Sequence, residues 1–144
     1  MGTISRNFSY REFERSATAD AHMICNVIRT FEVRDAIYEL VEEVLQPLRD
    51  EIGEPVDISS GYRCPELNAF IPRSSPTSQH TKGEAADIKA RTLSPLELAR
   101  VIVRMGLPFD QLILYPTFVH VSHKMGGPQR GQILYNRSYR GDRI

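Results

Sequence analysis

The sequence predicts an α+β fold, in which helices pack on one face of a small, mostly antiparallel sheet. Two observations lead to this prediction. Apolar residues recur at helical period in the first half of the chain, whereas the second half holds several short segments with strand-like composition. A single helical pattern interrupts these strand-like segments. This order of elements is typical of helices that cover one side of an antiparallel sheet.

Two helices are predicted in the first half. Ser9 and Glu12 have the spacing of a capping box, which predicts a short helix through about Ser16. The strongest pattern runs from residue 34 to residue 50. Its apolar stripe consists of Ile37, Leu40, Val41, Val44, Leu45 and Leu48. Pro47 lacks a backbone N–H, so we expect it to kink or end this helix near its last turn.

A third helix is predicted from Ser94 to Met105, and its boundary signals agree with one another. Ser94 suits the N-cap, Pro95 the first helical position and Glu97 the third position of a capping box. Gly106 follows the last apolar position and marks the end of the helix.

Five short segments are predicted as strands: 56–59, 85–89, 111–115, 118–123 and 132–136. Residues 71–84 are rich in Pro, Ser and Thr and predict an irregular loop. Loops held by a rigid sheet are common places for chemistry. The basic residues 137–144 are expected to form a loose tail.

Length and composition predict one folded domain over residues 1–144, which we expect to be monomeric. Apolar residues make up 41% and charged residues 25%, which excludes wholesale disorder and coiled-coil rods. Lysine and arginine together number 18, as do aspartate and glutamate, for a net charge of +0. We therefore expect neither nucleic acid nor a membrane surface as a partner.

Two cysteines, Cys25 and Cys64, are too few for a disulfide scaffold, and we expect both to be buried thiols. The first 16 residues are polar where a secretory signal would be apolar, and no apolar run approaches the roughly 20 residues of a membrane span. We therefore expect synthesis in the cytoplasm without a signal peptide.

Three residues could together bind a metal: His80, Asp87 and His120. Side chains alternate along a strand, so His120 and His123 should lie on opposite faces and should not share one ion. If the strands at 85–89 and 118–123 are neighbours, Asp87 and His120 lie side by side, and the turn through Gly83 could bring His80 over them. Two imidazoles and one carboxylate suit Zn²⁺ with an open fourth position. Spacing alone leaves ordinary hydrogen-bonding roles open.

Three segments carry a family resemblance: SGYRCPELN at 60–68, SQHTKGEAADI at 78–88 and FVHVS at 118–122. Together they resemble the zinc D-alanyl-D-alanine carboxypeptidase and dipeptidase family, which also includes phage L-alanyl-D-glutamate endolysins. The middle segment matches the family pattern SxHxxGxAxD at every fixed position. The resemblance extends from about residue 8 to 122 and is to the short, single-domain branch of bacteria and their phages. It implies the α+β fold that Hedgehog signalling domains share.

The resemblance implies three zinc ligands: His80, Asp87 and His120. It also implies that Arg63 faces the scissile carbonyl or a substrate carboxylate, and that Ser78 helps to hold the substrate. Simpler roles remain open for both, since Arg63 could pin the 65–76 loop and Ser78 could cap the loop before the first histidine. Gly83 and Ala85 are interpreted as steric requirements of the tight turn between the ligands.

The implied chemistry is hydrolysis of an amide by a metal-activated water, and its general base is unassigned. Relatives place Asp or Glu three residues before the last zinc histidine, where this chain has Thr117. Leu114 and Tyr115 occupy the stretch where some short relatives carry an acid. Asp110 and Glu84 are the nearby carboxylates, although a hydrogen bond at the start of a strand and solvent exposure are plainer roles for them.

Two functions of different classes follow from these observations. The first is a zinc peptidase that cleaves a peptidoglycan stem peptide at a D-Ala-D-Ala or an L-Ala-D-Glu bond, acting at the cell wall if it is a lysin. The second is a zinc-retaining, catalytically weak module that binds wall peptides or a protein. The ligand set with Arg63 and Ser78 favours the peptidase, whereas Thr117 favours the binding module.

Overall fold

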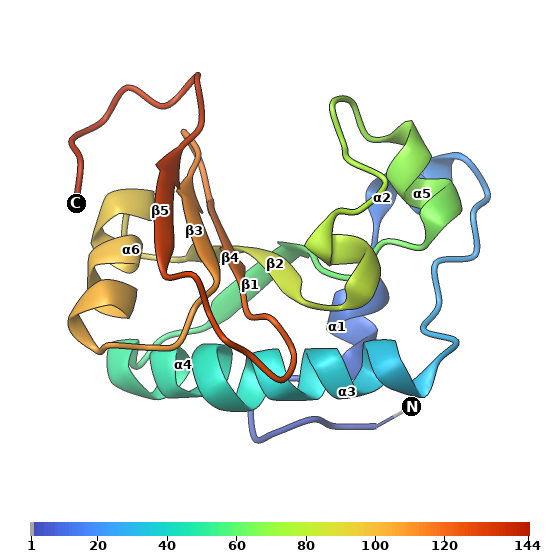
Figure 1. Cartoon of the computed structure of the whole chain (residues 1–144), viewed down its shortest axis with the longest axis horizontal. Coiled ribbons are helices and arrows are strands. Elements are labelled where there is room, and N and C mark those ends of the chain that lie inside the picture. Colours follow the sequence, from blue (N-terminus) through green and yellow to red (C-terminus); the bar gives the residue numbers. More distant parts are fainter. Residues whose placement is uncertain (1) are drawn as a thin grey trace.

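A computed structural model describes residues 2–144 and contains a five-stranded sheet with helices around it (Figure 1). The strands are β1 (Val56–Ser60), β2 (Ala85–Ala90), β3 (Gln111–Leu114), β4 (Val119–Ser122) and β5 (Gln132–Tyr135). The α-helices are α1 (Tyr10–Glu14), α2 (Ala17–Ala21), α3 (Phe31–Leu40), α4 (Gln46–Ile52), α5 (Pro65–Phe70) and α6 (Pro95–Arg104). Two further turns are π-helical η1 (Val41–Leu45) and 3₁₀-helical η2 (Gln79–Lys82). None of the described helices is long and apolar enough to cross a membrane.

The sheet has the strand order β1-β2-β4-β3-β5. All neighbouring strands pair antiparallel except β3 and β5, which run parallel. The predicted α+β class and mostly antiparallel sheet are therefore confirmed, and each predicted strand is present to within about one residue at either end. The strands β2 and β4 are neighbours, with Asp87 directly opposite His120.

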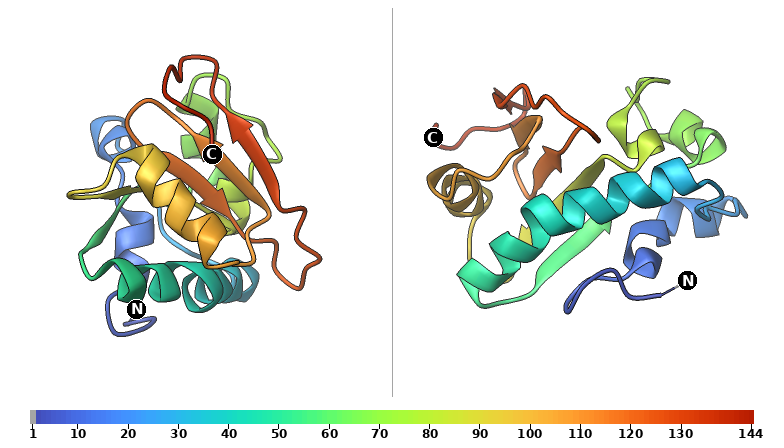
Figure 2. Two further views of the ribbon diagram at one scale, coloured as in Figure 1. Left: turned by 90° about the vertical axis from the view of Figure 1, so that its left-hand side faces the viewer. Right: turned by 60° about the horizontal axis from the view of Figure 1, so that its bottom comes forward.

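One face of the sheet is apolar and carries the main helices. The buried positions of β2, β3 and β4 belong to the same core cluster as residues of α3, η1, α4 and α6. The strand residues in this cluster are Ala86, Ile88, Leu112, Leu114, Val119 and Val121. Because side chains alternate along each strand, the intervening residues Asp87, Ile113 and His120 point to the other face. The views in Figure 2 show α6 and the long α3–α4 helix beside the sheet.

The predicted helix at 34–50 is part of one continuous helix from α3 through η1 to α4. Its apolar stripe is fully buried, as predicted. Pro47 does not end the helix, which continues to Ile52 and stops at Gly53, whose φ is +68°. Just before Pro47, the Gln46 N–H bonds to the Val41 carbonyl in the wider π-helical pattern. This local distortion accommodates a residue that has no N–H and whose ring would crowd a regular α-helix.

Both cysteines were expected to be buried, and this prediction is wrong. Cys25 is exposed, because it lies in the extended segment that leaves α2. Cys64 is only partly buried, because it is the N-cap of α5, where its sulfur accepts a hydrogen bond from the Leu67 N–H at 3.5 Å. Both thiols are free.

Residues 137–144, expected as a loose tail, contain no helix or strand but lie against β5 and α6. The Arg143 guanidinium stacks over the Tyr135 ring, 4.2 Å from its centroid. The Arg100 side chain donates to the Arg143 carbonyl at 3.2 Å, and the Ile144 N–H donates to the Tyr135 hydroxyl at 2.9 Å. The end of the chain therefore covers part of β5.

The turn η2 lies directly on α3, and Gly83 permits this close approach. Gly83 is the C-cap of η2 and has a φ of +76°. A Cβ atom at this position would lie 2.6 Å from the Val33 carbonyl oxygen and 3.0 Å from Ile37. The interpretation of Gly83 as a steric requirement is therefore supported by a backbone atom that cannot easily move.

Replacing Gly83 by alanine should destabilise the protein more than the same change at Gly53. Both glycines have positive φ, but nothing lies within 4 Å of a Cβ at Gly53. G53A should cost about 1–2 kcal/mol from backbone strain alone, and G83A about 1–3 kcal/mol more because of overpacking. Urea unfolding of the two variants measures the difference, and equal losses would contradict the packing argument.

The end of β4 is joined to α3 by His123, which is buried and points away from the metal-ligand candidates. Its Nδ1 atom lies 2.6 Å from the Pro108 carbonyl, and its Nε2 atom lies 2.9 Å from Glu39 Oε1. Glu39 also accepts the Gly126 N–H at 3.0 Å. That backbone hydrogen bond, together with His123, holds the pKa of Glu39 below its ordinary value despite partial burial.

Replacing Glu39 by glutamine should lower the free energy of unfolding by about 1 kcal/mol or more near neutral pH. A carboxyl whose pKa is lower in the folded state stabilises the protein above its unfolded pKa of about 4.3, and this contribution disappears as the pH falls through the folded pKa. The difference between wild type and E39Q should therefore shrink in acid. Urea unfolding at several pH values measures it, with E42Q as the exposed control on the same helix. A difference that stays constant with pH would exclude an ionised Glu39 as its source.

Candidate metal centre

His80 is positioned by the 3₁₀ turn η2 and by a backbone carbonyl. Ser78 is the N-cap of this turn, where its Oγ atom accepts the His80 N–H at 3.2 Å. The His80 ring is almost fully buried, and its Nδ1 atom lies 2.7 Å from the Gly61 carbonyl oxygen. A carbonyl only accepts hydrogen bonds, so Nδ1 carries the proton. The other ring nitrogen, Nε2, therefore faces Asp87 without a proton when the ring is neutral.

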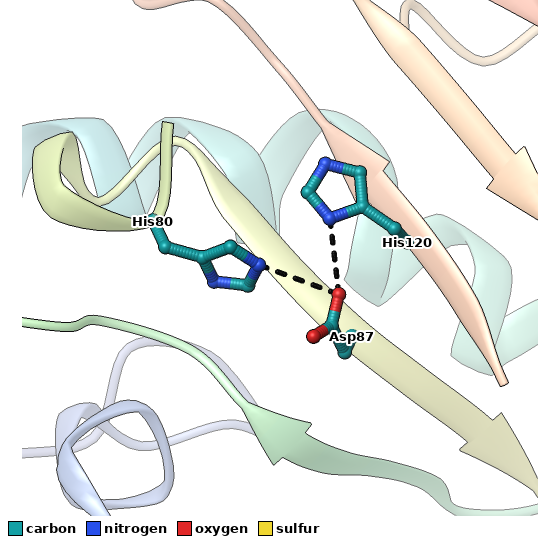
Figure 3. Close-up of side chains that lie close together, drawn as sticks. All are labelled: His80, Asp87 and His120. Atoms are coloured by element: carbon teal, nitrogen blue, oxygen red, sulfur yellow. Dashed lines mark hydrogen bonds and ion pairs between the residues drawn. The ribbon is translucent and has the colours of Figure 1, made fainter. Parts of the chain in front are cut away.

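Asp87 and His120 come from β2 and β4, at positions directly opposite each other. One carboxylate oxygen, Asp87 Oδ1, lies 3.0 Å from His120 Nδ1 and 3.3 Å from His80 Nε2, as the dashed lines in Figure 3 show. The possible ligand atoms of the three residues all lie within 4.8 Å of one another. The structure thus brings together the three residues that the sequence singled out. His123 does not join them, as strand alternation predicted.

The electrostatics of this group suit a cation. Burial alone would raise the pKa of Asp87, but the neighbouring imidazoles of His120 and His80 outweigh it and hold the pKa well below its ordinary value. Burial lowers the pKa of His80, and Asp87 only partly opposes this effect. A charged carboxylate and a neutral imidazole are the protonation states in which these side chains bind metals.

The contacts also indicate where a cation fits. The neutral His80 ring has one proton, directed at Gly61, so a nitrogen lone pair faces the charged oxygen of Asp87. Tetrahedral ligands of Zn²⁺ lie about 3.3 Å apart, close to the two distances between Asp87 and the histidines. A His80–Asp87–His120 set could therefore hold a metal with one coordination position left open.

Arg63 lies beside this group on the segment that joins β1 to α5. One of its terminal nitrogens is 3.7 Å from Asp87 Oδ2, while other guanidinium atoms donate to Ser60 at 3.3 Å and to Asn68 at 3.4 Å. Burial lowers the pKa of Arg63, and Asp87 opposes the shift. The Arg63 side chain thus hydrogen-bonds to α5 and also faces the candidate centre. A structural role in holding the 65–76 loop is therefore compatible with a role in contacting the substrate.

A pocket of about 660 Å³ opens from the three residues across the face of the sheet that carries no main helix. Its walls come from the 71–79 loop on one side and from the region of β3 and β5 on the other. Besides the three residues, its lining includes Arg63, Ser78, Gln111, Tyr115, Arg130 and Asn136. Ser78 therefore caps η2 and also faces the pocket.

The candidate general bases do not line this pocket. Both carboxylate oxygens of Asp110 accept hydrogen bonds from Arg130, and Glu84 accepts the Met125 N–H at 3.0 Å. Thr117 lies beside a different, smaller cavity. Within the described part of the chain, the only acidic residue in the pocket lining is Asp87 itself. The geometry therefore assigns neither Asp110 nor Glu84 as a base, and Thr117, where relatives carry the acid, does not face the pocket either.

The sequence did not identify Tyr115, Arg130 and Asn136 as pocket residues. Tyr115 follows the buried Leu114, so alternation beyond β3 could have placed it on the pocket face. Its ring stacks on Phe118 with centroids 4.3 Å apart. Burial and then Asp87 raise the pKa of Tyr115, so its hydroxyl keeps its proton near neutral pH. Arg130 and Asn136 flank β5, whose parallel pairing with β3 no local pattern predicts.

The comparison with protein families agrees with this geometry. The family model described as Peptidase M15 matches residues 6–122. The matched range includes the His80–Asp87–His120 group, Arg63 and Ser78, and it ends at the last residue of β4. None of the curated proteins compared with the chain matches it. The chain therefore belongs to the peptidase M15 family, whose members are zinc peptidases.

Proposed function

We propose that this protein is a zinc-dependent peptidase that hydrolyses an amide bond in a peptidoglycan stem peptide. The observation that carries this proposal is the group His80, Asp87 and His120 at the floor of a pocket that could admit a peptide. Membership of the M15 family supports the class of reaction. The bond would be D-Ala-D-Ala or L-Ala-D-Glu, and the protein would act at the cell wall.

His80 Nε2, Asp87 Oδ1 and His120 Nδ1 would hold the metal. When bound, zinc lowers the pKa of a coordinated water toward neutrality and polarises a carbonyl group. The protein fixes the three donors beforehand: Gly61 orients the ring of His80, and pairing of β2 with β4 sets Asp87 opposite His120. Little reorganisation is then needed when the ion binds.

Arg63 would bind the scissile carbonyl or a carboxylate of the peptide. Its guanidinium is held by Ser60 and Asn68 and keeps a fixed positive charge at the pocket floor. Fixed donors stabilise a developing oxyanion because they need no rearrangement during the reaction. Ser78 would contact the substrate, and the protonated hydroxyl of Tyr115 could donate a hydrogen bond to it.

A second function has a specific observation in its favour. No carboxylate other than Asp87 lines the pocket within residues 2–144, so a base of the usual type is missing. A zinc-retaining module that binds wall peptides or a protein, with weak or no catalysis, would need no such base. Measured turnover therefore decides between the two functions.

Zinc binding should depend on the three candidate ligands. Purified wild type is expected to bind one zinc ion per chain, and H80A and D87N are expected to lose it. Saturation at about 100 times the dissociation constant should stabilise the wild type by about 2.7 kcal/mol. Elemental analysis and thermal unfolding measure both effects. H22A is the matched control, since His22 stacks on Phe70 and is not part of the metal-ligand group found among residues 2–144. Full zinc retention by D87N would refute this site.

Digestion of muropeptides followed by mass spectrometry tests the proposed activity. The wild type with zinc should release D-Ala or split the stem peptide, whereas chelator and H80A should abolish the product. R63Q should lower kcat by about 100-fold or more, as losses of oxyanion donors do, while R63K should recover part of it. Zinc-loaded protein that binds muropeptides but yields no product would favour the binding module instead.

A further inference from the structure

Part of one wall of the pocket is built by residues beyond the range that matches the M15 family. The matched range ends at residue 122, and β5 follows it and pairs parallel with β3. Arg130 and Asn136, which flank β5, both line the pocket that contains His80, Asp87 and His120. These two residues therefore lie outside the range that the family model describes, yet they face the same pocket as the candidate metal ligands.

Arg130 is held at this wall by a network on one edge of its guanidinium. Its Nη2 atom donates to Asp110 Oδ2 at 2.7 Å, and its Nε atom lies 3.1 and 3.2 Å from the two carboxylate oxygens. Its backbone N–H also donates to Asp110, at 2.8 Å. The remaining nitrogen, Nη1, has no hydrogen-bond acceptor within residues 2–144, and the side chain is 57% exposed.

In this ion pair, the Asp110 carboxylate faces the protein interior and the Arg130 guanidinium faces the pocket. The Asp110 side chain is 1% exposed and does not line the pocket. The Gln79 side chain also donates to Asp110, at 3.1 Å, and Gln79 precedes His80 in the chain. Asp110 therefore fixes Arg130 relative to the candidate metal centre. The guanidinium of Arg130 presents positively charged hydrogen-bond donors to a ligand in the pocket.

The rest of the pocket favours an anionic ligand as well. Among the described residues, three arginines line it, namely Arg63, Arg73 and Arg130, whereas its one acid, Asp87, already has a histidine on either side. A planar guanidinium with a fixed orientation and an unpartnered edge suits a carboxylate. Arg63 faces the candidate centre itself, so Arg130 is placed to meet a different group of the same ligand.

We propose that Arg130 is a specificity-determining residue that binds a free carboxylate of the substrate peptide, and that Asp110 positions it. This inference rests on the proposed peptidase function and specifies its substrate class: peptides with a free carboxylate near the scissile bond. In a stem peptide this carboxylate is either the C-terminus or the α-carboxylate of the D-glutamyl residue. The chemistry that recognises the two is the same.

Three synthetic peptides distinguish these sources: L-Ala-γ-D-Glu-L-Lys-D-Ala-D-Ala, the same peptide with a C-terminal amide, and the same peptide with D-isoglutamine in place of D-glutamate. For zinc-loaded wild type, amidation at one of the two positions should lower kcat/KM by about tenfold or more. R130Q should lower kcat/KM for the free acid by the same factor. It should not change kcat/KM for the amidated peptide that wild type cleaves more slowly. R104Q, on the surface of α6, is the control and should match wild type.

Dissociation constants of the same peptides, measured by titration calorimetry on zinc-loaded protein, separate this inference from the peptidase proposal. If no peptide is cut, the proposed activity fails, yet a preference of wild type for one free acid that R130Q abolishes would still support Arg130. Because R130Q removes the ion-pair partner of the buried Asp110, the double variant D110N/R130Q, which also removes the buried charge, provides a second comparison. Equal losses for acid and amide, or a preference that survives in both variants, would overturn the assignment.

Discussion

The carboxylate of Asp87 is the constraint on which the rest of the site depends. It is buried near the middle of the sheet, and a buried charge is tolerated only when other groups compensate it. The compensation comes from three separate parts of the chain: His80 on η2, His120 on β4 and Arg63 ahead of α5. The strand pairing, the 3₁₀ turn and the β1–α5 connection therefore all converge on this one carboxylate.

This convergence requires close packing behind the site. The turn that carries His80 lies on α3 so tightly that a Cβ at Gly83 would meet the Val33 carbonyl. The carbonyl that orients His80 belongs to Gly61, where a Cβ would lie 2.7 Å from the Phe13 ring. Gly83 and Gly61 thus let α3 and α1 pack directly against the backbone around the candidate centre. The site is held by the same contacts that hold the fold.

Much of this arrangement follows from local patterns in the sequence. Periodicity in the sequence shows the buried stripe of the long helix and the five strands, and local spacing shows the capping box at Ser94. Alternation along the strand separates His120 from His123. The short helices α2 and α5 have too few turns to form a stripe, so they were not predicted. Arg130 was missed for a different reason, because its place at the pocket depends on long-range pairing of β5 with β3.

We propose that two imidazoles and one carboxylate hold the zinc and leave a position open to water. X-ray absorption at the zinc edge of the loaded protein tests it most directly, because the distances to nitrogen, oxygen and sulfur ligands differ. We expect nitrogen and oxygen ligands only, at about 2.0–2.2 Å, with two imidazoles. Sulfur at about 2.3 Å, from Cys25 or Cys64, would contradict it.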